Sequence, residues 1–273
     1  RSSGGTVLIS QYVGARRGED VEQTIGTLLT LFALAAVFMT AVMHIAARPF
    51  LILLRTPAES FENACSYMQI CMLGNFFVFE YNAISSVLNG TGDSKRPLIF
   101  VTISGTLNVF LDLLFVAGFK MGPNGSAWAT VLSQAVSFVI SAAYLIRKSS
   151  IFRLTRRNLK LSRTKVLLII KIGFPAAVQN SISSVSFMFL TALINQYGYA
   201  ASAAAQLAGK FNNIAMLPSS AMSGAMAVMS GQNIGARKYE RALSCLKEGI
   251  GLSLIVGIPL FLASISFTPQ FMS

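Results

Sequence analysis

Seven apolar segments, each of about 20 residues or more, dominate the sequence and limit what it can fold into. Such segments can cross a bilayer as helices, and they lack the alternation over about ten residues that is typical of membrane β-barrel strands. Only 12% of the residues are charged, against about 25% in a typical soluble domain. We therefore predict an all-α, polytopic membrane protein with an incomplete helix ending near residue 13 and spans at 22–47, 64–89, 97–119, 124–147, 166–194, 201–231 and 243–267.

Positive charge is concentrated between residues 147 and 165, where eight Lys and Arg residues occur with no acidic residue among them. A basic loop between two spans is cytoplasmic by the positive-inside rule, and alternation then puts the basic loops near 14–20, 91–96 and 232–241 on the same side. The net charge of +12 is therefore explained by topology and does not indicate a nucleic-acid partner. We expect the 148–165 linker to be solvated at the lipid headgroups, without a specific partner.

A short repeat relates the two halves of the chain. QYVGARRGE at residues 11–19 returns as QNIGARKYE at residues 232–240, and each copy follows a helix end and precedes the next helix. We call these two segments the GAR turns, and we predict that Gly14 and Gly235 adopt the left-handed conformation that ends many helices. Six spans from one GAR turn to the next are typical of duplicated six-helix transporter halves.

This spacing predicts two pseudo-symmetric six-helix bundles, of which the chain contains about seven full helices and a partial one. The predicted parts are an N-terminal bundle at 1–147, a basic cytoplasmic linker at 148–165 and a C-terminal bundle at 166–273. We expect the first helix to lie before residue 1 and about three helices to lie after residue 273.

Three motifs occur in order along the chain: LNGTGDSKRPL at 88–98, KIGFPAAVQNSIS at 171–183, and QNIGAR following GKFNNIAMLPSSAMSGAMAVMSG. Together they resemble the multidrug and toxic compound extrusion (MATE) transporter family. The resemblance implies a protein of the cell membrane with two bundles around a central cleft. Such a protein exports drugs or other amphipathic, often cationic, small molecules in exchange for sodium or protons by alternating access.

Acidic residues are rare within the predicted spans, where a charge costs about 2.5–3.5 kcal/mol on insertion scales. Asp112 is the strongest candidate for a functional acid, because Asn108 lies one helical turn before it on the same face. The next turn centres near residues 121–122, and equal counting across it places Asp112 level with Thr130, and Asn108 level with Gln134. A carboxylate, an amide and a hydroxyl would then converge, either to bind sodium or a proton or to join neighbouring helices by hydrogen bonds.

The family resemblance implies a role for the same three residues. Asn108, Asp112 and Thr130 match the cation site in the N-terminal half of bacterial and archaeal members, which also uses an Asp from the missing first helix. No Asp or Glu occurs between Lys165 and Tyr239, so an acidic coupling site in the second half looks absent. We therefore expect the coupling ion to bind in the N-terminal half, with no other metal.

Further polar residues within the spans are candidates for a substrate cleft. Glu80 could attract cationic substrates or extend toward the headgroups, and Pro218 could permit a helix bend that is static or that moves in transport. The amides could hydrogen-bond substrate or join helices. The candidate cleft residues are Glu80, Gln134, Gln179, Asn180, Asn212 and Pro218.

Other functions find less support in the sequence. A lipid or lipid-linked oligosaccharide flippase of the same superfamily shape would favour an Arg cluster within the spans, and none occurs. A membrane-embedded enzyme would need a nucleophile or metal set, but one His and the scattered Cys65, Cys71 and Cys245 form no such pattern. A non-functional truncated fragment remains an alternative. We expect no enzyme activity, no cofactor beyond Na+ or H+, and a monomer whose partners are a small-molecule substrate and the lipid bilayer.

Overall fold

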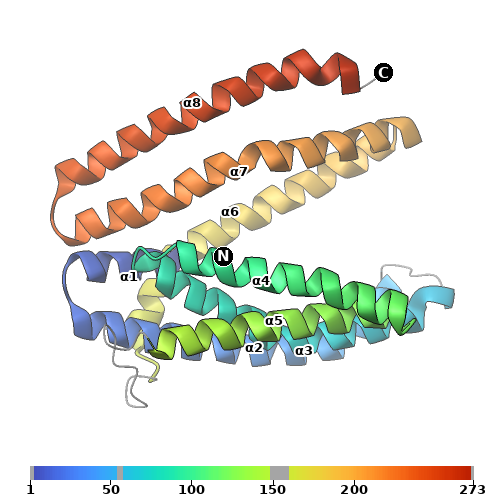
Figure 1. Cartoon of the computed structure of the whole chain (residues 1–273), viewed down its shortest axis with the longest axis horizontal. Helices are drawn as coiled ribbons and strands as arrows, with labels where there is room; N and C mark the ends of the chain where they lie inside the picture. Colours follow the sequence, from blue (N-terminus) through green and yellow to red (C-terminus); the bar gives the residue numbers. More distant parts are fainter. Residues whose placement is uncertain (1–2, 54–57, 148–159, 272–273) are drawn as a thin grey trace. The chain divides into compact units, whose positions relative to one another are not determined.

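A computed structural model describes residues 3–53, 58–147 and 160–271 (Figure 1). These residues are almost entirely helical, which confirms the all-α prediction. In chain order the elements are α1 (Ser3–Gly14), α2 (Gly18–Leu53), α3 (Ala58–Gly90), α4 (Lys95–Asp112), the π-helix η1 (Leu113–Gly118), α5 (Pro123–Arg147), α6 (Arg163–Asn195), α7 (Tyr199–Gly235) and α8 (Tyr239–Phe271).

Among the described residues, seven helical segments are long and apolar enough to cross a membrane. They match the seven predicted spans in number and order, and the chain is a multi-pass membrane protein. Most of the helices extend beyond the apolar segments, as α2 does at Gly18–Leu53 against a predicted 22–47. The added first turn contains Glu19 and Asp20, whose charges favour the amide-rich start of a helix.

Backbone contacts divide the chain into two compact units. Unit 1 contains residues 1–9 and 17–169, and unit 2 contains residues 10–16 and 170–273. The helices α1 and α6 therefore each contribute residues to both units. The three-part division at 147 and 165 stays a prediction about the full-length protein.

Unit 1 is built around α3. In Figure 1, α3 lies beside α2 and α5, and the register of these contacts is set by small and aromatic residues. Gly74 of α3 lies against Val131 of α5, whose Cα atom would be 3.5 Å from a Cβ added at the glycine. On the side of α2, the rings of Phe79 and Phe32 lie 6.1 Å apart.

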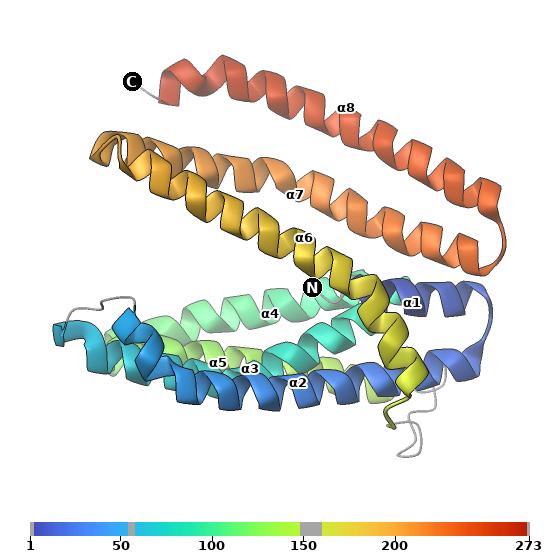
Figure 2. The same cartoon turned by 180° about the vertical axis from the view of Figure 1, so that it is seen from behind.

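In unit 2, α7 and α8 form a long antiparallel hairpin (Figure 2). The contact is tight where Gly249 of α8 meets the side chain of Met226, because a Cβ at the glycine would collide with the methionine sulfur. Nearer the turn, the Asn233 amide of α7 donates a hydrogen bond to the Cys245 sulfur of α8 at 3.7 Å. These contacts identify the face of α7 that α8 covers.

The two GAR turns have the same backbone conformation, but the left-handed residue was predicted wrongly. Arg16 has φ of 55° and Arg237 has φ of 58°, whereas Gly14 and Gly235 are the last residues of α1 and α7 and do not have positive φ. The glycines are required for close approach instead. A Cβ added at Gly14 would collide with the carbonyl oxygen of Gln232, and a Cβ added at Gly235 would collide with the carbonyl oxygen of Gln11. All four residues belong to unit 2.

The turn between α3 and α4 holds three helices together. Gly92 has φ of 92°, as its glycine allows, and the Asp93 carboxylate accepts a hydrogen bond from the Arg96 amide at 3.4 Å. The other oxygen of Asp93 accepts a hydrogen bond from the Tyr144 hydroxyl of α5 at 3.0 Å. The guanidinium of Arg96 lies 5.0 Å from the centre of the Tyr144 ring. The motif LNGTGDSKRPL at 88–98 is thus explained by the structure of this turn.

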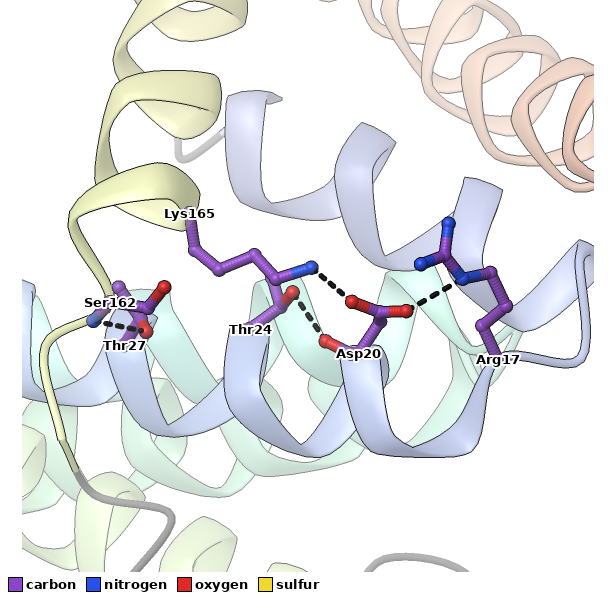
Figure 3. A network of polar contacts seen from close by, with 6 residues as sticks. All are labelled: Arg17, Asp20, Thr24, Thr27, Ser162 and Lys165. Carbon is purple, nitrogen blue, oxygen red and sulfur yellow. Dashed lines mark hydrogen bonds and ion pairs between the residues drawn. The ribbon is translucent and has the colours of Figure 1, made fainter.

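The end of the basic linker is not simply solvated, which corrects the prediction for Lys165. Its ammonium group lies 2.5 Å from the Asp20 carboxylate of α2, and its side chain is only 7% exposed (Figure 3). Thr27 of α2 adds a second attachment, because its hydroxyl accepts from the Ser162 amide and donates to the Lys160 carbonyl, both at 3.3 Å. Most of the linker, residues 148–159, lies outside the described residues.

Candidate functional site

The structure places Asp112 at the junction between α4 and the π-helix η1. The residue is half-buried, and its Oδ1 atom is buried without a hydrogen-bond partner among the described residues. Single π-helical turns inside α-helices occur frequently at functional sites. A carboxylate oxygen that is removed from water and has no donor is available to a cation or a proton.

Asn108 and Thr130 lie next to each other across α4 and α5. The Asn108 amide donates to the Thr130 hydroxyl at 3.5 Å, and that hydroxyl donates to the Ser126 carbonyl at 3.0 Å. Asn108 is one helical turn from Asp112, so the three side chains predicted for the cation site belong to one region of unit 1.

The predicted register of this hairpin was wrong by one turn. Equal counting from the turn put Thr130 level with Asp112, whereas the structure puts it against Asn108, and the Ser104 hydroxyl of α4 reaches the Ser133 carbonyl at 2.8 Å. A π-helix places more residues in each turn than an α-helix does, so η1 advances less along its axis. Because Ser104 lies opposite Ser133, the half-buried Gln134 lies beyond Asn108 rather than opposite it.

Two polar residues of unit 1 were missed by the sequence analysis, and one of them, Tyr67, lies near Asp112. Tyr67 of α3 interacts electrostatically with Asp112, and it also hydrogen-bonds Cys71. Asn124, at the start of α5, has a buried side-chain oxygen without a hydrogen-bond partner among the described residues. Tyr67 gave no signal within a long apolar span, and Asn124 follows Gly122 and Pro123 and therefore resembled an ordinary turn residue.

The donor atoms of this region determine which ions it suits. Within the described residues, no three His, Cys, Asp or Glu side chains gather into a cluster that could hold a transition metal. One carboxylate with amide, hydroxyl and phenol oxygens suits a hard monovalent cation, or a proton on Asp112 itself.

Glu80 occupies a separate place in unit 1. It is only 6% exposed, and its Oε1 atom has no hydrogen-bond partner within the described structure. Its neighbours Phe79 and Phe77 turn toward α2 and α5 respectively, where they contact Phe32 and Phe138. Glu80 thus lies between these two contact faces of α3, about ten residues or 15 Å from the inner end of the helix.

The remaining candidates lie on α6 and α7 of unit 2. Gln179, Asn180 and Asn212 are exposed in the described structure, and Gln179 lines a shallow groove on α6 with Pro175 and Val178. Pro218 lies inside α7, which continues through it to Gly235.

Comparison with protein families and characterised sequences gives consistent matches. The family model described as MatE matches residues 1–114 and 175–273. The "Probable multidrug resistance protein YoeA" of Bacillus subtilis is 29% identical over 278 residues, which cover 99% of this chain and 60% of that protein. The "Probable multidrug resistance protein NorM" of Thermotoga maritima is 26% identical over 96% of this chain and 58% of its own length. The chain thus spans about three fifths of these two relatives.

Solved structures have the same fold. The "Crystal structure of MATE in the bent conformation" has a TM-score of 0.91 at 23% identity and is matched over 98% of this chain and 60% of that one. The "Outward-facing conformation of a multidrug resistance MATE family transporter of the MOP superfamily" has a TM-score of 0.88 at 22% identity, with coverage of 99% and 61%.

Proposed function

The chain belongs to the MatE family, and we propose that the full-length protein is a cation-coupled antiporter that exports amphipathic small molecules across the cell membrane. The names of its relatives refer to multidrug resistance, which supports drugs and similar compounds as the exported class. A transport function rather than an enzymatic one agrees with this family membership.

One observation carries the coupling proposal. Asp112 has a buried oxygen that receives no hydrogen bond within the part of the chain that the structure describes, and it lies one helical turn from the hydrogen-bonded pair Asn108–Thr130. In our proposal, sodium or a proton binds the Asp112 carboxylate, and the Asn108 carbonyl and the Thr130 hydroxyl supply further oxygens. The amide that Asn108 now uses toward Thr130 keeps these two side chains oriented.

Ion binding would drive transport by changing the balance between two conformations. Alternating access requires only that the ion and the substrate bind the two conformations with different affinity. Neutralising Asp112 removes the cost of a buried charge, and the conformation that buries this carboxylate most then becomes favoured. Glu80 and the polar side chains of Gln134, Gln179, Asn180 and Asn212 are the proposed contacts for the exported compound.

The basic linker is proposed to lie on the cytoplasmic side, and the substrate would therefore be taken up from the cytoplasm. Labelling of a cysteine introduced at Ser150 tests this orientation. A membrane-impermeant maleimide should react with it in inverted vesicles and should not react in intact cells.

The decisive test is Asp112→Asn in the full-length protein, which removes the charge and preserves the shape of the side chain. We expect export of a fluorescent cation such as ethidium to stop responding to imposed sodium and proton gradients, while expression is unchanged. Glu62→Gln is the matched control, because Glu62 is an exposed acid, 77% accessible, that pairs with Arg48 at 3.6 Å. Normal gradient-driven export by Asp112→Asn would refute the site.

A further inference from the structure

Glu80 is a buried acid of unit 1 that the coupling proposal at Asp112 does not use. It lies inside α3, about ten residues or 15 Å from the inner end of the helix, and it is only 6% exposed. Ala83, Ile84 and Val87, which follow on the same face of α3, are buried as well. Ionisable residues at such a depth in a membrane span are costly, and they usually mark a pathway for ions or protons.

The contacts described on either side of Glu80 are apolar. Phe79 meets Phe32 of α2, with ring centres 6.1 Å apart, and Phe77 meets Phe138 of α5, with ring centres 6.0 Å apart. The Glu80 Oε1 atom is buried and accepts no hydrogen bond from the described residues. Glu80 therefore lies between two aromatic contacts, without a donor on this oxygen in the described part of unit 1.

The helices around α3 offer no cation to Glu80 in the part of unit 1 that the structure describes. Its titratable neighbour Tyr81 donates its hydroxyl to the Pro97 carbonyl of α4 at 2.8 Å. The buried Lys165 is paired with Asp20, near the start of α2. The stretches of α1, α2, α4 and α5 that contain no Asp, Glu, Lys, Arg or His are 3–9, 23–43, 97–111 and 123–146.

A proton is the simplest group that can neutralise an acid in this position. An ionised carboxylate that is removed from water and has no cation beside it is costly, and such groups usually become neutral instead. Taking a proton from water at neutral pH also costs free energy, but much less than burying the charge. When the same carboxylate meets water in another conformation, it ionises again and the proton leaves.

Glu80 is also well separated from the candidate cation site. Tyr67 of α3 interacts electrostatically with Asp112, and Glu80 follows Tyr67 by thirteen residues on the same helix. Thirteen residues correspond to about 20 Å along the helix axis. An ion bound at Asp112 therefore leaves the Glu80 carboxylate free to bind a proton of its own.

Resting on the proposed export function, we propose that Glu80 is a second proton-binding site of this protein, independent of the ion at Asp112. The Glu80 carboxylate binds one proton in the conformation described here, and it returns the proton to water in a conformation that exposes it. The proton has the same effect as any ligand that binds two conformations with different affinity, because it favours the conformation in which Glu80 is buried.

Infrared spectroscopy of the purified full-length protein in lipid nanodiscs tests this proposal without a transport assay. The carbonyl stretch of a protonated carboxylic acid absorbs apart from that of a carboxylate. At neutral pH we expect the wild type to show a component of this absorption that Glu80→Gln lacks and that Asp112→Asn keeps. The component should shift after transfer to deuterium oxide and disappear when the pH is raised.

Two further variants serve as controls. Glu62→Gln should keep the component, because Glu62 is an exposed acid that pairs with Arg48. Glu80→Asp retains the acid on a shorter side chain, so it should show the component at a changed frequency. This variant gives a positive signal that a loss of folding in Glu80→Gln could not imitate.

Each outcome decides the proposal. Identical spectra of the wild type and Glu80→Gln at neutral pH would overturn it, because Glu80 would then be ionised. A component that neither exchanges with deuterium oxide nor disappears at high pH would also overturn it, because a sealed proton serves only packing. Loss of the component in Asp112→Asn would show that the two acids are not independent. If Asp112→Asn exports normally while the Glu80 component titrates, the coupling site at Asp112 fails and the Glu80 site stands.

Discussion

Gly14 lies directly against the backbone of Gln232, and Gly235 makes the equivalent contact with Gln11. Each contact joins the fourth residue of one GAR turn to the first residue of the other, so the two copies of the repeat pack against each other reciprocally. Both contacts lie within unit 2. A repeat that looked like two independent helix ends is therefore one joint made from both copies.

This joint predicts a strong effect of adding one methyl group. Gly14→Ala and Gly235→Ala should each destabilise the protein by about 1–3 kcal/mol, because the backbones must separate to accept a Cβ. The thermal unfolding midpoint of the protein purified in detergent measures the effect. Gly105→Ala is the control, since nothing lies within 4 Å of a Cβ at that position and alanine favours a helix. Equal midpoints for all three variants would disprove the contact.

The ion pair between Lys165 and Asp20 predicts a second stability effect. Lys165→Met should cost about 3 kcal/mol, because it leaves a largely buried carboxylate without its cation. Asp20 keeps a second, exposed partner in Arg17 at 2.6 Å, which limits the loss. Chemical unfolding of the single and double variants measures the coupling, and Asp20→Asn together with Lys165→Met should recover much of the loss. Lys171→Met serves as the exposed control, and a loss of the same size there would argue against a specific pair.

We expect removal of the Thr130 hydroxyl to weaken ion binding without abolishing it. Thr130→Val preserves shape but removes the hydroxyl that Asn108 contacts, so we expect the apparent affinity for the coupling ion to fall about tenfold without complete loss of export. The concentration of sodium, or the pH, that gives half-maximal export measures this change. Thr102→Val is a suitable control, because the exposed Thr102 hydroxyl donates to the Leu98 carbonyl of its own helix. A comparable shift in that variant would remove the support for Thr130 as a ligand.

We expect the loss of the Glu80 charge to raise the stability of the protein and to lower its export activity. Glu80→Gln should raise the unfolding midpoint, because it removes a buried charge, one oxygen of which has no hydrogen-bond partner among the described residues. Export of a cationic probe should fall about tenfold, the equivalent of losing about 1.4 kcal/mol of attraction. Parallel thermal and efflux assays give both readings. A variant that is less stable, or that exports the cation normally, would mean that Glu80 serves only the packing of α3.

Local sequence patterns were sufficient to predict the helices. Hydropathy depends on each segment's own residues, and the bilayer permits few alternatives to a helix for such segments. The equivalence of the GAR turns and the pairing of Asp112 with Asn108 on one face also follow from short-range spacing.

Other features depended on contacts between residues far apart in the chain. The need for glycine at positions 14 and 235 arises from helices more than 200 residues apart, and Lys165 finds its partner 145 residues away. The register of α4 against α5 depended on a π-helix, for which the residues of Leu113–Gly118 gave no local signal. Tyr67 of α3 came near Asp112 only when α3 and α4 met.

The sequence by itself therefore determined the number of spans and the internal repeat, and it suggested the residues that we propose as a cation site, because hydrophobicity, charge and helical period are properties of local segments. Only the tertiary structure decided which side chains meet, which glycines are needed for close packing and which charges are buried. Those properties depend on the distance between backbones, and that distance is set by packing across the whole unit.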